Sequence, residues 1–169
     1  MKKVVAGLTL IAALLLVMAM PSPAMAVEDS LGAEVTIGAI INFTVEDNGQ
    51  AGLKFGSLIP GSSDNPELAQ NGSGAVTLSL GAETNVNCNV STKASDFASG
   101  SDTIPIGNAT WDTDNSVSGA TAMTDDYAQI TTLSAGNWQD VWHWLSVPGN
   151  QAPGIYTTDF YYQALEATS

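Results

Sequence analysis

The longest alternation of apolar and polar positions in the chain lies between Glu34 and Glu46. Apolar residues occupy its odd positions: Val35, Ile37, Ala39, Ile41, Phe43 and Val45. Apart from Ile40, the even positions between them are polar or glycine. Because successive side chains of a strand point to opposite faces, this run predicts a 13-residue strand with one continuous apolar face.

Shorter alternating runs follow, separated by turn-forming residues. Strands are expected at residues 52–58, 76–80, 86–90, 127–133, 140–147 and 155–165, with another piece around Ile104, Ile106 and Trp111. Pro105 cannot donate a ladder hydrogen bond, so that piece is expected at an edge or at a strand start. Residues 140–147 and 155–165 are expected to form a hairpin across the loop 148–154, and residues 112–126 to form a long surface loop.

Helical periodicity is nearly absent after residue 26, and Gly, Asn, Ser and Thr are abundant there. This combination predicts an all-β protein. We expect a single immunoglobulin-like or jelly-roll-type β-sandwich of about seven to nine antiparallel strands. The sandwich domain is expected to cover residues 47–169, after an N-terminal leader and long amphipathic strand at residues 27–46.

The first 26 residues have the pattern of a cleaved signal peptide. Lys2 and Lys3 precede an apolar run, and the small residues Ala24 and Ala26 close it. The apolar run is too short for a membrane span, and no later segment is suitable for one. We therefore expect a secreted protein that is extracellular or attached to the cell surface, with no membrane span in its mature form.

The charge balance excludes two classes of partner. The chain has 17 acidic and 4 basic residues and a formal net charge of −13. Nucleic acids and anionic membranes bind proteins through Lys and Arg, so neither is an expected partner. Cys88 is the only cysteine, which excludes an intramolecular disulfide; it is expected to be a buried, inert thiol.

Two accounts of the run from Glu34 to Glu46 remain open at this stage. In the first, it is the first strand of the domain's own sandwich, bent at Gly38 or Ala39 so that it passes between sheets. In the second, its apolar face inserts into a neighbouring subunit, as in donor-strand complementation. Its place near the mature N-terminus suits the second account, because a terminal segment leaves its domain without breaking a loop.

A family resemblance favours the second account. The run 52–61 (GLKFGSLIPG), the run 84–91 (TNVNCNVS) and the ending with Trp144 to Pro148 and Gly154 to Tyr156 carry it. Taken with the leader and the first strand, they resemble exported prokaryotic β-sandwich fibre and pilus subunits, of the TasA-type biofilm fibre and archaeal bundling-pilus kind. The resemblance implies subunits that polymerise through an N-terminal donor strand. The donor-strand residues would be Val35, Ile37, Ala39, Ile41, Phe43 and Val45.

The residues needed for catalysis or cofactor binding are scarce. His143 is the only histidine, which excludes a two-histidine copper site, and no Gly-x-Ser-x-Gly motif accompanies it. It is expected to be a structural residue of the domain interior. The acidic residues around Asp112 and Asp125 do not match the calcium-loop pattern. We expect neither an enzyme nor a cofactor or metal site.

Two kinds of carbohydrate chemistry remain open on an exported chain. Asn42, Asn71, Asn89 and Asn108 each begin an Asn-x-Ser/Thr sequon and are candidates for N-glycosylation, with Asn71 in the clearest loop. The tryptophans at 138, 142 and 144 form either a sugar-stacking platform or part of the core.

The sequence thus favours a structural subunit of an extracellular filament, pilus or matrix fibre, whose partners are copies of itself. Other surface proteins or polysaccharides are further candidate partners. The alternative is a monomeric secreted binding module for carbohydrate or cations. A secreted hydrolase ranks last, because the chain offers no nucleophile, base or metal cluster in a recognisable pattern.

Overall fold

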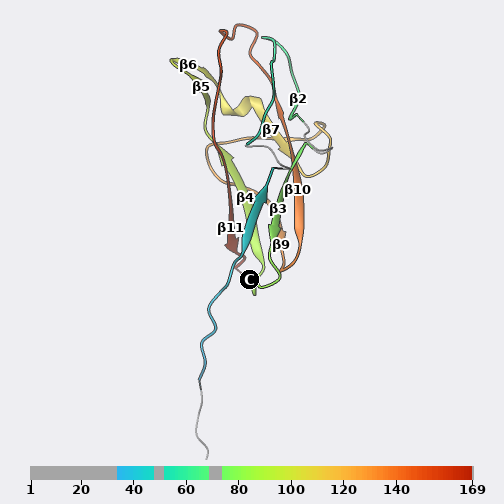
Figure 1. Cartoon of the computed structure of the whole chain (residues 1–169), viewed down its shortest axis with the longest axis vertical. Helices are drawn as coiled ribbons and strands as arrows, with labels where there is room; N and C mark the ends of the chain where they lie inside the picture. Colours follow the sequence, from blue (N-terminus) through green and yellow to red (C-terminus); the bar gives the residue numbers. More distant parts are fainter. Residues whose placement is uncertain (1–33, 48–51, 69–73, 169) are drawn as a thin grey trace, which may run out of the picture. The chain divides into compact units, whose positions relative to one another are not determined.

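The computed structural model describes residues 34–47, 52–68 and 74–168 and confirms an all-β sandwich-like fold (Figure 1). The predicted signal peptide (1–26) and the first residues of the predicted leader lie outside the described part. The compact unit that contains all the described strands begins at Ile37. The helical structure within the described residues is one short 3-10 turn at Ile106–Asn108.

The described residues contain eleven strands. In chain order they are β1 (Phe43–Glu46), β2 (Asn65–Pro66), β3 (Ala75–Leu80), β4 (Cys88–Ala94), β5 (Phe97–Ser99), β6 (Asp102–Ile104), β7 (Ala109–Asp112), β8 (Thr121–Ala122), β9 (Ala128–Leu133), β10 (Trp138–Leu145) and β11 (Phe160–Glu166). The number exceeds the expected seven to nine because several short pairs, such as β5 with β6, are separate strands.

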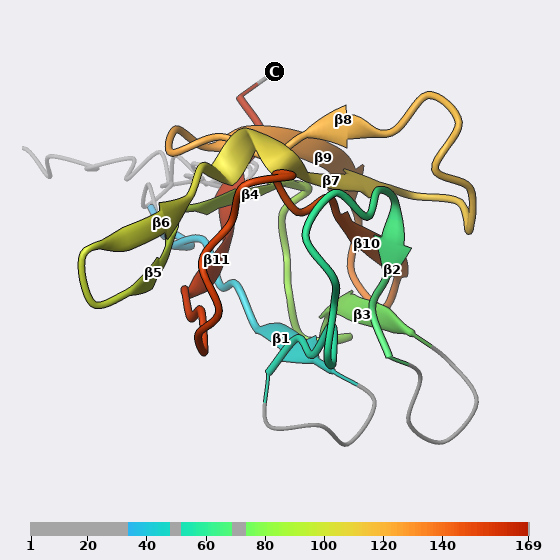
Figure 2. The same ribbon diagram turned by 90° about the horizontal axis from the view of Figure 1, so that it is seen from above.

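Two main antiparallel sheets form the sandwich. The first has the order β1-β3-β10-β7-β8, with β2 also paired to β10, and the second has the order β11-β4-β9. Viewed from above, the two sheets face each other, and β1 and β11 lie on the same side of the sandwich (Figure 2). The register between β4 and β9 shifts between Val90 and Ser91, where Ile130 of β9 is the extra residue of a β-bulge.

The core lies between the sheets and follows the alternation seen in the sequence. Val76, Leu78 and Leu80 of β3 are at most 2% exposed, and they face Cys88 and Val90 of β4, which are fully buried. The polar residues of β3 alternate with its buried residues and lie on the outer face of the sheet. The strands expected at residues 76–80 and 127–133 are therefore confirmed as β3 and β9.

The expected 13-residue first strand is much shorter in the structure. Only Phe43–Glu46 forms a ladder, with β3, while residues 34–42 have no regular secondary structure. The ladder does not extend before Phe43 because its partner strand β3 ends at Leu80 and a turn begins at Gly81. Beyond that point the chain opposite residues 38–42 is a loop and offers no strand to extend the ladder.

The expected hairpin of residues 140–147 and 155–165 is wrong. β10 lies in the first sheet between β3 and β7, whereas β11 pairs with β4 in the second sheet. The connecting segment contains Pro148 and Pro153, and it passes from one sheet to the other instead of making a tight turn.

The structure differs from three smaller expectations. Residues 52–58 form no strand, because Gly52 and Gly56 have φ angles of +89° and +73°, which a strand does not adopt. The piece around Pro105 is divided, since β6 ends at Ile104 and β7 begins at Ala109 after the 3-10 turn. The loop expected at 112–126 contains the short strand β8.

Candidate functional site

Residues 38–42 run along the turn that follows β3 and are fastened to it by hydrogen bonds. The Asn85 side chain accepts from the Ile40 N–H at 2.8 Å and donates to the Gly38 carbonyl at 3.0 Å. The Asn85 N–H donates to the Ile40 carbonyl at 3.2 Å, and the Thr84 hydroxyl accepts from the Asn42 N–H at 3.1 Å. The backbone is thus held mainly by side chains of the loop and not by a strand.

These hydrogen bonds engage only every second residue. Gly38, Ile40 and Asn42 point their backbone groups toward residues 81–85. Within the described part of the chain, the N–H and C=O groups of Ala39 and Ile41 have no hydrogen-bond partner. Because backbone groups of an extended chain alternate in direction, residues 37–41 present a free hydrogen-bonding edge.

The apolar side chains of the same segment are also exposed to solvent. Ile37 is 79% exposed and Ile41 is 38% exposed, and Ala39 between them is exposed as well. Val35, which belongs to the preceding unit, is 81% exposed. The interior of the chain's own sandwich therefore does not take up this apolar run, as a strand of its own core would require.

The remaining two candidates for the donor strand lie in β1. Phe43 pairs with Leu80 and packs partly buried against the core, and Val45 pairs with Leu78. Val45 points to the same face as Phe43 but is 43% exposed. The structure thus divides the predicted run into an exposed segment up to Ile41 and a paired strand from Phe43.

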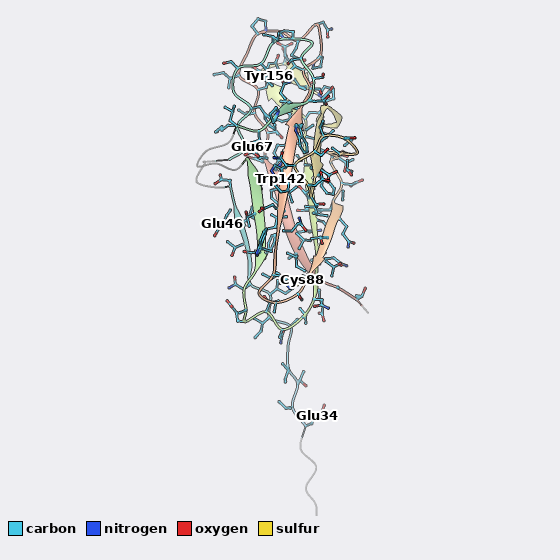
Figure 3. The ribbon with its side chains drawn as sticks, turned by 90° about the vertical axis from the view of Figure 1, so that its right-hand side faces the viewer. Glu34, Glu46, Glu67, Cys88, Trp142 and Tyr156 are labelled. Carbon is cyan, nitrogen blue, oxygen red and sulfur yellow. The ribbon has the colours of Figure 1, made fainter. Side chains whose placement is uncertain are left out.

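A buried polar cluster links the two sheets and was not foreseen from the sequence. The Tyr162 hydroxyl of β11 lies 3.0 Å from Nε2 of His143 on β10. On the other side of the ring, Nδ1 of His143 lies 3.8 Å from Oε2 of Glu67, and neither of these two atoms has a hydrogen-bond partner among the described residues. His143 is 1% exposed and Glu67, labelled in Figure 3, is 6% exposed, so the cluster belongs to the interior.

Burial sets the protonation states of this cluster. It raises the pKa of the Glu67 carboxyl to about 8, with a smaller contribution from the charge of Asp47. It lowers the pKa of His143 to about 3, and it raises the pKa of the Tyr162 hydroxyl. At neutral pH Glu67 is therefore predominantly protonated and His143 is neutral, so the pair is not an ion pair.

The cluster supports a structural and not a catalytic interpretation. The Phe160 ring packs edge-on against the His143 ring at 5.4 Å, and Tyr162 packs beside it. A general base must reach the proton that it abstracts from a substrate, and this imidazole is enclosed by its own domain. His143 is buried, as predicted, while Glu67 and Tyr162 are distant in sequence and carry no motif that could have revealed them.

Cys88 is a fully buried free thiol, as predicted. Burial raises its pKa, with a smaller contribution from Glu166. Because the thiolate is the reactive form, a buried thiol with a raised pKa is inert.

The sequon asparagines differ in their surroundings. Asn42 is exposed, and its side-chain amide donates to the Glu83 carboxylate. The Asn108 amide donates to the Pro105 carbonyl at 3.1 Å, and Asn89 accepts from Thr132 at 2.7 Å on the outer face of the second sheet. Asn71 lies outside the described residues.

The acidic loops and the tryptophans are not gathered into a single site. Among the described residues, no group of three or more His, Cys, Asp or Glu side chains is placed to hold a metal ion. Trp144 is only 6% exposed, so a platform made of Trp142 and Trp144 is not available on the surface. Trp138, by contrast, is 62% exposed. No helix in the described ranges is long and apolar enough to cross a membrane.

Comparison with known proteins returns no match to a family model and no match among curated protein sequences.

Proposed function

We propose that this protein is the structural subunit of an extracellular filament, pilus or matrix fibre, and that it polymerises by donor-strand complementation. After export and removal of the signal peptide, residues 35–41 of one copy add a strand to a sheet of the next copy. The proposal assigns the protein no enzymatic activity. The observation that carries it is the state of residues 37–41, whose apolar side chains are exposed and whose backbone is unpaired along one edge.

The free backbone edge supports strand addition directly. An extended segment with unpaired N–H and C=O groups is a template for pairing with another chain, and proteins usually protect such edges with charge, proline or a bulge. Residues 35–41 contain neither a charged residue nor a proline. The segment therefore combines a free ladder edge with apolar side chains, which are the two elements of β-strand addition.

We propose that the acceptor lies between β1 and β11. These strands end their respective sheets, so within the described residues each has one edge without a sheet neighbour. Leu78 of β3 is fully buried, but Val45, its partner on β1, is 43% exposed on the same inner face. Phe160 and Ala164 of β11 are likewise only partly buried against the core. A strand added here would cover apolar side chains that the chain's own sheets leave open.

The free energy available from side chains can be compared with the cost of association. Burying a large aliphatic side chain contributes about 1.5–3 kcal/mol. Ile37 is 79% exposed and Val35 81% exposed, so most of this contribution is still available, whereas Ile41 retains less than half of it. The three together contribute on the order of 5 kcal/mol, comparable with the ~4–15 kcal/mol lost on association. Ladder hydrogen bonds and subunit contacts then decide assembly, which should depend on concentration.

The test uses two neighbouring substitutions that bring the same charge to opposite faces of the segment. Ile37→Asp places a carboxylate on the apolar face, and Thr36→Asp places one on the polar face. Both positions are exposed, so neither change should lower the melting temperature of the monomer. We expect Ile37→Asp to abolish filaments seen by electron microscopy, while Thr36→Asp still assembles. Equal assembly of the two variants, or no filaments from the wild-type mature chain at any concentration, would contradict the proposal.

A further inference from the structure

The outer face of the first sheet carries an exposed tryptophan beside a row of polar side chains. Trp138, the first residue of β10, is 62% exposed. The ladder places Ser79 of β3 opposite Trp138, and Thr77 opposite Asp140. Glu46 of β1 pairs with Thr77 from the other side, so polar groups of three adjacent strands extend in a row from the indole.

These five residues line an open depression of about 350 Å³. Within it, the Thr77 hydroxyl donates to Oδ1 of Asp140 at 2.6 Å, which fixes the carboxylate. The second oxygen of Asp140 and the carboxylate of Glu46 remain as acceptors, while the Ser79 hydroxyl is both a donor and an acceptor. The side chains of Trp138 and Asp140 point to this face because they alternate with Val141, which faces the core.

We propose that this depression is a binding site for a neutral pyranose unit of a polysaccharide. One face of a pyranose ring presents C–H groups, which are attracted to the electron-rich face of an indole, and its edge presents hydroxyl groups. Trp138 supplies the indole, and Asp140, Glu46 and Ser79 supply hydrogen-bonding groups around it. Hydrogen bonds from hydroxyls to carboxylates are stronger than those between neutral groups, which gives such a site orientation.

The surrounding charge selects an uncharged sugar. Glu46 and Asp140 would repel the carboxylate or sulfate of an acidic glycan, and the formal net charge of −13 adds to this repulsion. The open, shallow form of the depression suits one or two units within a long chain and not an enclosed small molecule. The site is distinct from residues 35–41, so sugar binding and polymerisation are separate properties of the chain.

The test is affinity electrophoresis and calorimetry of the mature chain with a panel of neutral glycans. The panel contains cello-oligosaccharides, chito-oligosaccharides, laminarin and mannan, with alginate as the acidic comparison. We expect binding to at least one neutral glycan and none to alginate. Trp138→Ala should weaken that binding about tenfold or more, because the stacking surface is removed. Asp140→Asn should weaken it less, because the amide still accepts one hydrogen bond.

Tyr161→Ala is the matched control, because Tyr161 is an exposed aromatic residue on β11 of the other sheet. It should leave glycan binding unchanged. No binding to any glycan of the panel, or equal binding by wild type and Trp138→Ala, would overturn the proposal. It would also be overturned if Trp138→Ala prevented filament formation and no glycan bound, since the face would then be a contact between copies. Binding of calcium chloride alone, without any glycan, would identify a cation site instead.

Discussion

Replacing Glu67 by glutamine should remove the loss of stability that we expect for this protein as the pH rises from about 6.5 to 8. The Glu67 side chain is buried, and its Oε2 atom lies 3.8 Å from Nδ1 of His143 and has no hydrogen-bond partner within the part of the chain that the structure describes. Burial raises the pKa of the carboxyl from 4.5 to about 8. Glutamine keeps the shape of the protonated acid but cannot ionise, so the variant isolates the contribution of this proton.

The sign of this pH dependence follows from the number of protons that the folded and the unfolded chain bind. Between pH 4.5 and pH 8 the folded chain retains the Glu67 proton and the unfolded chain has released it. The free energy of unfolding therefore falls as pH rises through this window. At about 1.4 kcal/mol for each pH unit, the full change is on the order of 5 kcal/mol. His143 acts in the opposite direction, because its pKa is lowered to about 3 and stability is lost as pH falls from 6.5 toward that value. Stability should be greatest between about pH 4.5 and pH 6.5.

The assay is urea unfolding at pH 5.5 and pH 8.5, on preparations kept dilute enough to remain monomeric. The wild type should lose about 2 kcal/mol between these two pH values, because the loss of about 3.4 kcal/mol from Glu67 is partly offset by a gain of about 1.4 kcal/mol from His143. Glu67→Gln should show no loss. Glu166→Gln is the control, because Glu166 is an exposed carboxylate on β11 and its removal should leave the wild-type decline intact. The same decline in Glu67→Gln as in the wild type would refute the assignment of the effect to this buried carboxyl.

Three further predictions concern other contacts in the domain. Asn85→Ala removes two hydrogen bonds to residues 38–40. Hydrogen exchange of the Ile40 amide should accelerate at least about fivefold, since each bond contributes ~1 kcal/mol. Unchanged exchange would show that the Asn85 side chain does not hold this segment. Tyr162→Phe leaves Nε2 of His143 without its partner, so the free energy of unfolding should fall by about 1–3 kcal/mol, and an unchanged melting temperature would argue against this bond. Cys88 should react with a thiol reagent such as Ellman's only after unfolding in urea, and rapid reaction of the native protein would contradict its burial.

Alternation along the chain was sufficient to predict the strands that line the core. It correctly placed Val76, Leu78 and Leu80 on one face of a strand and Cys88 and Val90 on one face of another, and all five are buried, because period-two burial is a local property of a strand. The all-β class followed from the same patterns together with the scarcity of helical periodicity.

Pairing between strands could not be predicted in the same way. Residues 140–147 and 155–165 each alternate, but alternation does not say which strand lies beside which, and β10 and β11 lie in different sheets. The long run ending at Val45 shows a second limit. Its pattern defines an apolar face, but the length of its ladder depends on where the opposite strand β3 ends.

For the candidate sites, too, local patterns could be predicted from the sequence, whereas contacts between distant residues could not. The exposed apolar run up to Ile41 was visible as a pattern, although its exposure required the structure. The cluster of Glu67, His143 and Tyr162 joins residues far apart in sequence, and no spacing rule connects them. The depression beside Trp138 depends on the register of three strands, which a sequence alone does not specify.

The most direct test of the central claim removes the donor segment and then returns it as a peptide. A mature chain that begins at Asn42 keeps β1 and the contact between Asn42 and the turn after β3, but it lacks residues 35–41. The account predicts filaments from the full mature chain by electron microscopy. It predicts monomers from the shortened chain by size-exclusion chromatography, and binding of a peptide of residues 34–41 but not of its scrambled form. Filaments from the shortened chain, or a monomeric full mature chain at every concentration tested, would contradict it.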